Sequence, residues 1–157
     1  MKIILWSVGK QNESYVKEGV TDFTDRINKY FPCEWKLIAP PKNAAMMSIE
    51  ELREVESNTL LNYLDPVDYI VLLDERGKML SSPNLARLIE ERAVNGAKKM
   101  HFVIGGAFGV TDAVRKRADL VWQLSQLVFP HQLVRLILTE QLYRACTILR
   151  NEKYHHH

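Results

Sequence analysis

Short apolar runs alternate with amphipathic stretches along the chain, and the two patterns predict different elements. Runs rich in Val, Ile and Leu predict five strands, at residues 2–8, 33–38, 68–74, 100–105 and 120–125. The run at 68–74, DYIVLLD, is nearly continuous and typical of a strand buried on both faces. Strands that alternate with helices favour an α/β fold with a mostly parallel sheet. The length fits a single domain over residues 1–157.

Helices are predicted between these strands from apolar residues at helical spacing and from residues that favour helix ends. They are expected over residues 14–30, from 48 onward, and over residues 82–96, 111–118 and 130–149. Ser48 with Glu51 three positions later forms a capping-box pattern. Ser82 is expected to cap the third helix, because Pro83 then takes the first helical position and Gly96 can end the helix.

The last predicted helix carries apolar residues around nearly its whole circumference, and such a helix is buried on all sides. A central position in the domain would cover it, and so would a second copy of the chain; we favour a homodimer. Arg135 points into an apolar sector of this helix between Leu142 and Cys146. A buried arginine needs a carboxylate, backbone carbonyls or a phosphate as its partner.

Composition limits the cellular environment that we expect for the protein, but it does not identify a function. No apolar run approaches the roughly 20 residues of a membrane span, and the first residues resemble a strand more than a signal peptide. Cys33 and Cys146 lie outside any C-x-x-C pair, which favours free thiols in a reducing cytoplasm. Residues 1–66 hold 8 Lys/Arg against 10 Asp/Glu, whereas residues 67–157 hold 13 against 9. The C-terminal part is therefore the better candidate surface for a polyanion.

Three loops that follow the last three strands are the candidate ligand-binding segments. Ligands of open α/β sheets bind outside the carboxyl ends of the strands, so we expect these loops to converge on one pocket. The middle loop contains the spacing G-G-x-x-G from Gly105 to Gly109. This is neither the dinucleotide fingerprint nor a P-loop, which would end in Gly-Lys-Ser/Thr. The glycines either let backbone approach a ligand or simply form a tight turn.

Five motifs in order resemble the RlmH family of the SPOUT superfamily, which are bacterial ribosomal RNA methyltransferases. They are LDERGK-x-x-SS (73–82), FVIGGAFG (102–109), SQLVFPHQLVR (125–135), EQLYRA (140–145) and the terminal Tyr154-His155. The resemblance spans essentially the whole chain, including the KIILWSVGK start. It implies a trefoil-knotted α/β fold, with the knot over approximately residues 70–150, and a homodimer. It further implies S-adenosylmethionine-dependent methylation of N3 of a pseudouridine in 23S rRNA on the assembled ribosome.

The resemblance also implies which residues hold the cofactor. The S-adenosylmethionine pocket maps onto Leu73, Gly105, Leu124, Ser125, Gln126, Leu127, Val128 and Phe129. Relatives often carry threonine where this chain has Val128, a change that removes one side-chain hydrogen bond and leaves backbone contacts intact. Backbone amides and apolar walls suit adenine, so a phosphate-binding loop is not expected for this ligand.

Candidate catalytic residues follow from the chemistry of methyl transfer, which is an in-line displacement that depends mostly on positioning. N3–H of a pseudouridine must lose its proton, so a general base is useful, and His155 is the first candidate. Arg144 can stabilise the anionic pyrimidine, and Tyr154 can stack on the base or donate a hydrogen bond. The plain alternatives are a helix salt bridge between Glu140 and Arg144, and a Tyr154 that only anchors the tail. No metal site is expected from the histidines at 155–157, because no matching ligand cluster accompanies them.

Seven basic residues are candidates for phosphate contacts, and together they predict salt-sensitive RNA binding. They are Arg76, Lys78, Arg115, Lys116, Arg117, Arg150 and Lys153. Two other functions are weighed against a methyltransferase. A non-catalytic RNA-binding module would keep the fold but fail to bind S-adenosylmethionine, and a doubly wound nucleotide-binding enzyme is disfavoured by the absent phosphate loop.

Overall fold

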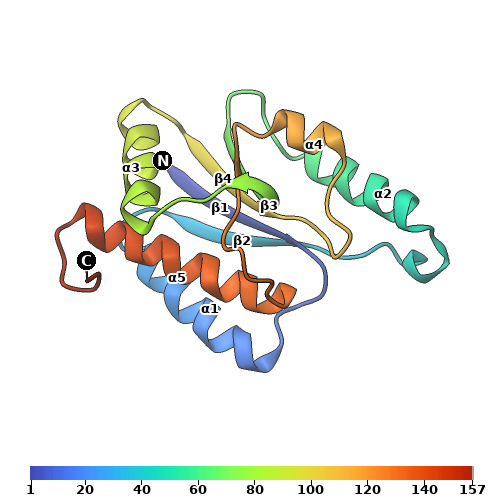
Figure 1. Ribbon diagram of the computed structural model, residues 1–157, viewed down its shortest axis with the longest axis horizontal. Helices are drawn as coiled ribbons and strands as arrows, with labels where there is room; N and C mark the ends of the chain where they lie inside the picture. Colours follow the sequence, from blue (N-terminus) through green and yellow to red (C-terminus); the bar gives the residue numbers. More distant parts are fainter. Residues whose placement is uncertain (157) are drawn as a thin grey trace.

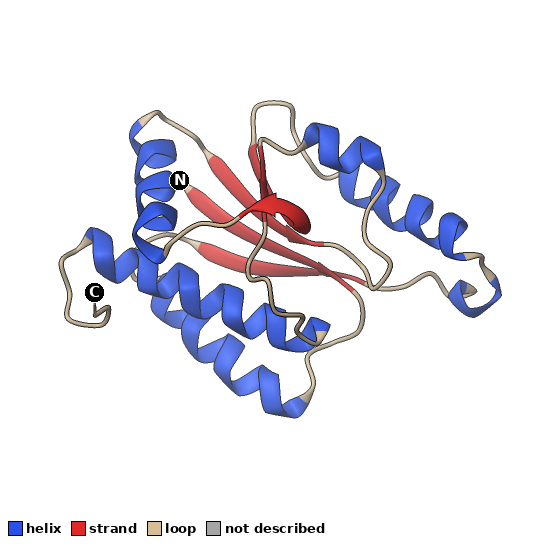
Figure 2. Ribbon diagram, viewed as in Figure 1, coloured by secondary structure: helices blue, strands red, loops and turns tan. Residues whose placement is uncertain are grey.

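The computed structural model describes residues 1–156 and contains one five-stranded sheet (Figures 1 and 2). Its strands are β1 (Lys2–Val8), β2 (Cys33–Ile38), β3 (Tyr69–Lys78), β4 (Lys99–Ile104) and β5 (Leu120–Trp122). They lie in the order β2-β1-β4-β3-β5, and every pairing is parallel. The three strands nearest one edge, β4, β3 and β5, therefore end on the same side, where their following loops can meet.

Five helices cover the two faces of the sheet, and they make three layers (Figure 1). They are α1 (Ser14–Ile27), α2 (Ile49–Leu61), α3 (Ser82–Val94), α4 (Asp112–Arg117) and α5 (His131–Leu149), with a short 3-10 turn at Ala44–Met46. Helices α1, α3 and α5 pack on one face, and α2 and α4 pack on the other. The predicted α/β fold with a parallel sheet is confirmed. No helix within residues 1–156 is long and apolar enough to cross a membrane.

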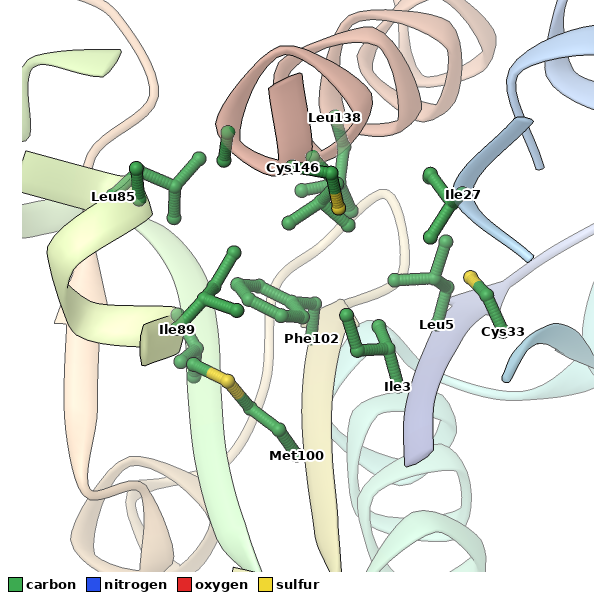
Figure 3. Close-up of a cluster of buried hydrophobic side chains, with 14 of the residues drawn as sticks. Ile3, Leu5, Ile27, Cys33, Leu85, Ile89, Met100, Phe102, Leu138 and Cys146 are labelled. Atoms are coloured by element: carbon green, nitrogen blue, oxygen red, sulfur yellow. The ribbon is translucent and has the colours of Figure 1, made fainter. Parts of the chain in front are cut away.

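Two buried clusters hold the layers together, one on each face of the sheet. Successive residues of a strand point to opposite faces, so Ile3 and Leu5 join the cluster under α1, α3 and α5 while Ile4 and Trp6 join the cluster under α2 and α4. Figure 3 shows the first cluster, in which Phe102 lies between the strands and the helices. Both faces of the central strands are apolar, as the continuous apolar runs predicted.

Cys33 and Cys146 are free and buried in the first cluster (Figure 3), which confirms the prediction of unpaired thiols. Burial raises the pKa of both thiols to about 12. Both thiols are therefore protonated and unreactive near neutral pH, and they act as small apolar side chains.

Three predicted element boundaries are wrong by a few residues. Helix α1 stops at Ile27 because the Asn28 side chain exchanges two hydrogen bonds with the backbone of Cys33, both 2.9 Å, and so turns the chain into β2. Strand β3 continues past residue 74 to Lys78 after a register shift against β5. Strand β5 ends at Trp122, three residues early, and the chain leaves the sheet there.

The cap of α3 is Ser81 and not Ser82. The Ser81 hydroxyl accepts a hydrogen bond from the Asn84 amide at 3.1 Å, which is the interaction an N-cap makes. Ser82 instead lies in the first turn and donates its hydroxyl hydrogen to Gln141 Oε1 at 2.6 Å. It therefore connects α3 to α5. The cap predicted for α2 is confirmed, because Ser48 Oγ accepts from the Glu51 amide at 3.1 Å.

Candidate active site

A cavity of about 520 Å³ lies at the carboxyl ends of β3, β4 and β5, a size usual for a small-molecule site. Its wall is built from residues 73–76, 104–110 and 123–129, together with Arg115, His131 and Val134. The three segments predicted as loops therefore do converge on one pocket, although residues 73–76 belong to β3. All eight residues assigned to the S-adenosylmethionine pocket lie on this wall, and binding of that cofactor stays a prediction.

The turn after β4 needs glycine for two reasons, a left-handed backbone at Gly109 and a close contact within the protein at Gly106, and backbone approach to a ligand stays a prediction. Gly109 has φ 81°, a left-handed conformation that side chains other than glycine rarely adopt, and its amide donates to Gly106 O at 3.0 Å. At Gly106 the reason is close approach, because a β-carbon there would lie 2.5 Å from Glu56 Oε1. The tight turn and the close contact together bring main chain to the cavity wall.

Helix α2 holds this turn from behind through three side chains. Arg53 Nε donates to Phe108 O at 3.0 Å, Ser57 Oγ accepts from the Thr111 amide at 3.0 Å, and Glu56 contacts Gly106. No motif in the sequence signals these three residues. Ser57 and Thr111 are 54 positions apart, and no local spacing signals such a contact.

Two of the charged side chains on the cavity wall, Asp74 and Arg115, are engaged within the chain. Arg115 Nη1 lies 2.6 Å from Asp112 Oδ1, and Arg115 Nε lies 3.5 Å from Asp74 Oδ2. Asp74 Oδ1 also accepts from the Arg76 amide at 2.9 Å. Of the basic residues predicted to contact phosphate, Arg115 is thus engaged within the chain. Arg117 is too, since it donates to Asp65 O at 2.7 Å and to Asp68 O at 3.0 Å.

Arg135 lies beneath the cavity with 1% of its surface exposed, as the sequence indicated. Its Nε donates to Ser7 Oγ at 2.8 Å, and its Nη1 donates to Lys10 O and Asn12 Oδ1 at 2.8 and 2.9 Å. Within residues 1–156 its hydrogen-bond partners are neutral acceptors, and burial lowers its pKa. His131 Nε2, on the cavity wall, lies 3.1 Å from the same Ser7 hydroxyl. Burial, and then the Arg135 charge, lower the pKa of His131.

The three predicted catalytic residues meet at the far end of α5. Arg144 Nη2 lies 2.6 Å from Glu140 Oε1, and Arg144 Nη1 donates to His155 Nδ1 at 3.2 Å. Tyr154 Oη donates to Glu140 Oε1 at 3.0 Å, and the Arg144 guanidinium lies 4.8 Å from the centre of the Tyr154 ring. Burial and the Glu140 hydrogen bond raise the pKa of Tyr154. Glu140 organises this cluster, and the expected helix salt bridge is one part of it. Of the terminal histidines, His157 lies outside the described residues.

The cavity and the tail cluster do not meet within one chain. Val134 lines the cavity, and Arg144 is ten residues farther along the same helix. At 1.5 Å per residue, the two are about 15 Å apart along α5. Figure 1 shows the C-terminus beyond the end of α5 that is opposite to its start. The structure therefore separates the two halves of the predicted site.

A parallel sheet covered on both faces, with three segments around a cavity at the strand ends, is typical of open α/β proteins that bind a small molecule there. Residues 1–155 match the sequence profile described as "Predicted SPOUT methyltransferase". A probable methylase family protein from Haemophilus influenzae Rd KW20 has a similar fold, with a TM-score of 0.56 and 10% identity, covering 99% of this chain and 70% of that one.

Curated relatives narrow the family further. Proteins named ribosomal RNA large subunit methyltransferase H are 42% identical in Cytophaga hutchinsonii, covering 99% of this chain and 100% of the relative, and 43% identical in Trichlorobacter lovleyi, covering 98% and 97%. The relative of that name from Parabacteroides distasonis is 40% identical, covering 99% of each chain. The chain belongs to the RlmH family of SPOUT methyltransferases, which confirms the resemblance seen in its motifs.

Proposed function

We propose that this protein transfers a methyl group from S-adenosylmethionine to N3 of a pseudouridine in 23S rRNA, on the assembled ribosome in the cytoplasm. The observation that carries the proposal is the convergence of the three loops around one cavity with main chain on its wall. A neutral-to-cationic donor needs backbone polar groups and apolar walls, and the cavity supplies both. The names of the family relatives support a large-subunit RNA as the substrate.

The donor is expected to lie against Leu73, Gly105 and the residues from Leu124 to Phe129. Backbone amides and carbonyls of these loops would orient the adenosine, since few side chains here are free to do so. Leu127 and Val128 are adjacent apolar residues of the cavity wall with 72% and 94% of their surfaces exposed. Cover by a ligand or by a second subunit would account for this exposure.

A homodimer would bring the tail of one subunit to the cavity of the other. This arrangement accounts for the separation of about 15 Å within one chain, because the partner's tail need not follow the same helix. It would also cover Leu133 and Ile137 of α5, which remain partly exposed in the single chain. A two-fold axis would then create two equivalent sites, each built from both chains.

The tail cluster of Glu140, Arg144, Tyr154 and His155 suggests how the N3 proton is removed and how the charge of the pyrimidine anion is stabilised during methyl transfer. A guanidinium can only donate, so His155 Nδ1 accepts from Arg144 in this structure. While that bond lasts, a neutral ring carries its proton on Nε2 and has no lone pair for the substrate. We therefore expect His155 Nδ1 to release Arg144 before it takes the N3 proton, which frees Arg144 to face the developing pyrimidine anion. The S–CH₃ bond then breaks with its electron pair left on sulfur as the N3–CH₃ bond forms.

The phosphate contacts are expected from the predicted basic residues that remain exposed. Arg76, Lys78, Lys116 and Lys153 are exposed, and the first two lie in the last part of β3, where Arg76 lines the cavity. Arg150 is exposed as well, with its guanidinium 5.4 Å from the centre of the Tyr30 ring. This surface is small, so recognition would depend on the shape of the ribosome more than on sequence.

The proposal is tested with ribosomes from a strain that lacks this methylation. Purified protein and S-adenosylmethionine should add one methyl group to a pseudouridine of 23S rRNA, located by mass mapping of the nucleotide. Protein-free 23S rRNA is the matched control and should be a poor substrate. Methylation of another nucleotide, or equal activity on protein-free RNA, would contradict the proposed substrate.

A further inference from the structure

Glu56 is a buried carboxylate that the proposed reaction does not yet use. Only 8% of its surface is exposed, and within residues 1–156 its side chain forms neither a hydrogen bond nor an ion pair. Burial raises its pKa. An unpaired carboxylate inside a protein is costly, so such a group either takes up a proton or is stabilised by a positive charge nearby, which a cationic ligand would supply.

Glu56 lies directly behind the cavity wall. A β-carbon at residue 106 would lie 2.5 Å from Glu56 Oε1 and 3.2 Å from Cδ, so the carboxylate packs against the Gly106 backbone. Gly106 in turn lines the cavity. Only the thickness of one main-chain segment therefore separates this negative charge from a bound ligand.

The two acidic residues that line the cavity, Asp74 and Glu75, differ from Glu56, because Glu75 is exposed to solvent and Asp74 has a basic neighbour. Asp74 has Arg115 beside it at 3.5 Å, and Arg115 compensates its charge. Arg53, the basic residue one turn before Glu56, directs its Nε to Phe108 O. Within residues 1–156, Glu56 is thus a buried carboxylate beside the glycine turn that has no ion pair, in a partly dehydrated position where charges interact strongly.

We propose that Glu56 is the counter-charge for the cationic methyl donor and discriminates it from the neutral product. This inference rests on the proposed donor site. S-adenosylmethionine carries a positive sulfonium, whereas S-adenosylhomocysteine is an uncharged thioether once the methyl group has left with sulfur keeping the electron pair. The field of Glu56 attracts the first ligand and not the second. The same charge therefore strengthens donor binding and favours exchange of product for fresh donor.

The test is calorimetric titration of the full-length protein at about pH 8, above the usual range of carboxyl pKa values. The probes are S-adenosylmethionine, S-adenosylhomocysteine and sinefungin, whose amine carries a positive charge near the sulfonium position. Glu56→Gln should weaken the two cationic ligands about tenfold and leave S-adenosylhomocysteine unchanged. Glu54→Gln removes an exposed charge from the same helix and should change none of the three affinities.

A structural role for Glu56 would give a different pattern. If Glu56→Gln weakened all three ligands equally, or none, the inference would be overturned while the donor site stood. Glu56→Asp keeps the charge and alters the packing, so it should retain the preference for cationic ligands even if the protein is less stable. Loss of that preference in Glu56→Asp would contradict the inference. A wild-type protein that bound neither S-adenosylmethionine nor S-adenosylhomocysteine would overturn the proposed donor site itself.

Discussion

Arg135 is a charged residue in the interior, and within residues 1–156 its hydrogen bonds go to neutral acceptors. Its side chain joins Ser7 in β1 to the backbone of Lys10 and the side chain of Asn12, so it holds the loop after β1 against α5. The sequence predicted the burial of Arg135 but left its partner open among carboxylate, carbonyl and phosphate. The partner could not be predicted because it lies more than 120 residues away in the chain.

Replacing this residue tests how much the buried network contributes. Arg135→Met should lower the free energy of unfolding by about 1–3 kcal/mol, because it leaves the Lys10 carbonyl and the Ser7 hydroxyl without their donor. Arg150→Met, at an exposed position, should cost no more than about 0.5 kcal/mol. Urea unfolding of both variants measures the difference. Equal losses in the two proteins would show that the buried hydrogen bonds contribute little.

His101 is a second buried polar residue, 1% exposed between Trp6 and Asp68. An indole N–H can only donate, so Trp6 Nε1 donates to His101 Nδ1 at 2.9 Å. The ring proton then sits on Nε2 and is donated to Asp68 Oδ2 at 2.8 Å. Protonation of His101 would place a second ring proton on Nδ1, where it would face the indole N–H of Trp6. Burial lowers the pKa of His101, with Asp68 acting in the opposite direction.

A depressed histidine pKa makes folding stability depend on pH. The unfolded state binds a proton near pH 6.5 that the folded state resists, so the stabilisation is full above about pH 6.5 and is lost as the pH falls below it. The free energy of unfolding should decrease from about pH 7 to about pH 5.5, by at most about 1.4 kcal/mol per pH unit for each histidine.

The matched variant is His101→Gln, which keeps a side-chain donor for Asp68 and removes the titrating ring. Its pH dependence should be weaker than that of the wild type. Some dependence should remain, because burial also lowers the pKa of His131. Urea unfolding across this pH range measures both proteins, and parallel curves would contradict the role of His101.

At the scale of elements, strands and helix starts were largely predictable because periodicity and caps are local signals. The ends of the elements were less predictable, because tertiary contacts determine where an element stops. Asn28 ends α1 by hydrogen bonding to Cys33, and β3 is longer than predicted because Lys78 pairs with Trp122. The capping error has the same origin. Ser81 and Ser82 are equivalent in sequence, and the contact of Ser82 with Gln141 leaves Ser81 to cap α3.

No sequence motif indicated that helix α2 supports the glycine turn. The contribution of this support to stability and to ligand affinity can be measured. Ser57→Ala removes the acceptor of the Thr111 amide, so it should cost about 1–2 kcal/mol of stability and weaken S-adenosylmethionine binding several-fold. Thr59→Ala, which removes a hydroxyl bonded only to Val55 O in the same helix, is the control and should leave affinity unchanged. Unfolding and calorimetry measure the pair. Unchanged affinity in Ser57→Ala would show that α2 does not position the turn.

For the whole molecule, the alternation of strands and helices predicted an α/β fold with a parallel sheet. It predicted neither the threading of the chain nor the position of the tail cluster. The resemblance supplied the trefoil threading over residues 70–150, and that threading stays a prediction. Pattern alone placed the donor loops together because parallel strands end on one side. It could not show that the tail cluster lies about 15 Å from them along α5.

In the proposed homodimer, one active site takes its cavity from one subunit and its tail from the other. Two variants damage these halves separately: Gly105→Val, whose β-carbon would lie 2.7 Å from Val110 Cγ1, and His155→Ala. Each alone should methylate ribosomes poorly. The measurement is the activity of the two proteins after they are mixed and their subunits exchanged. Random pairing restores one intact site in half of the dimers, so about a quarter of wild-type activity should return. A mixture no more active than its separate components would contradict the shared site.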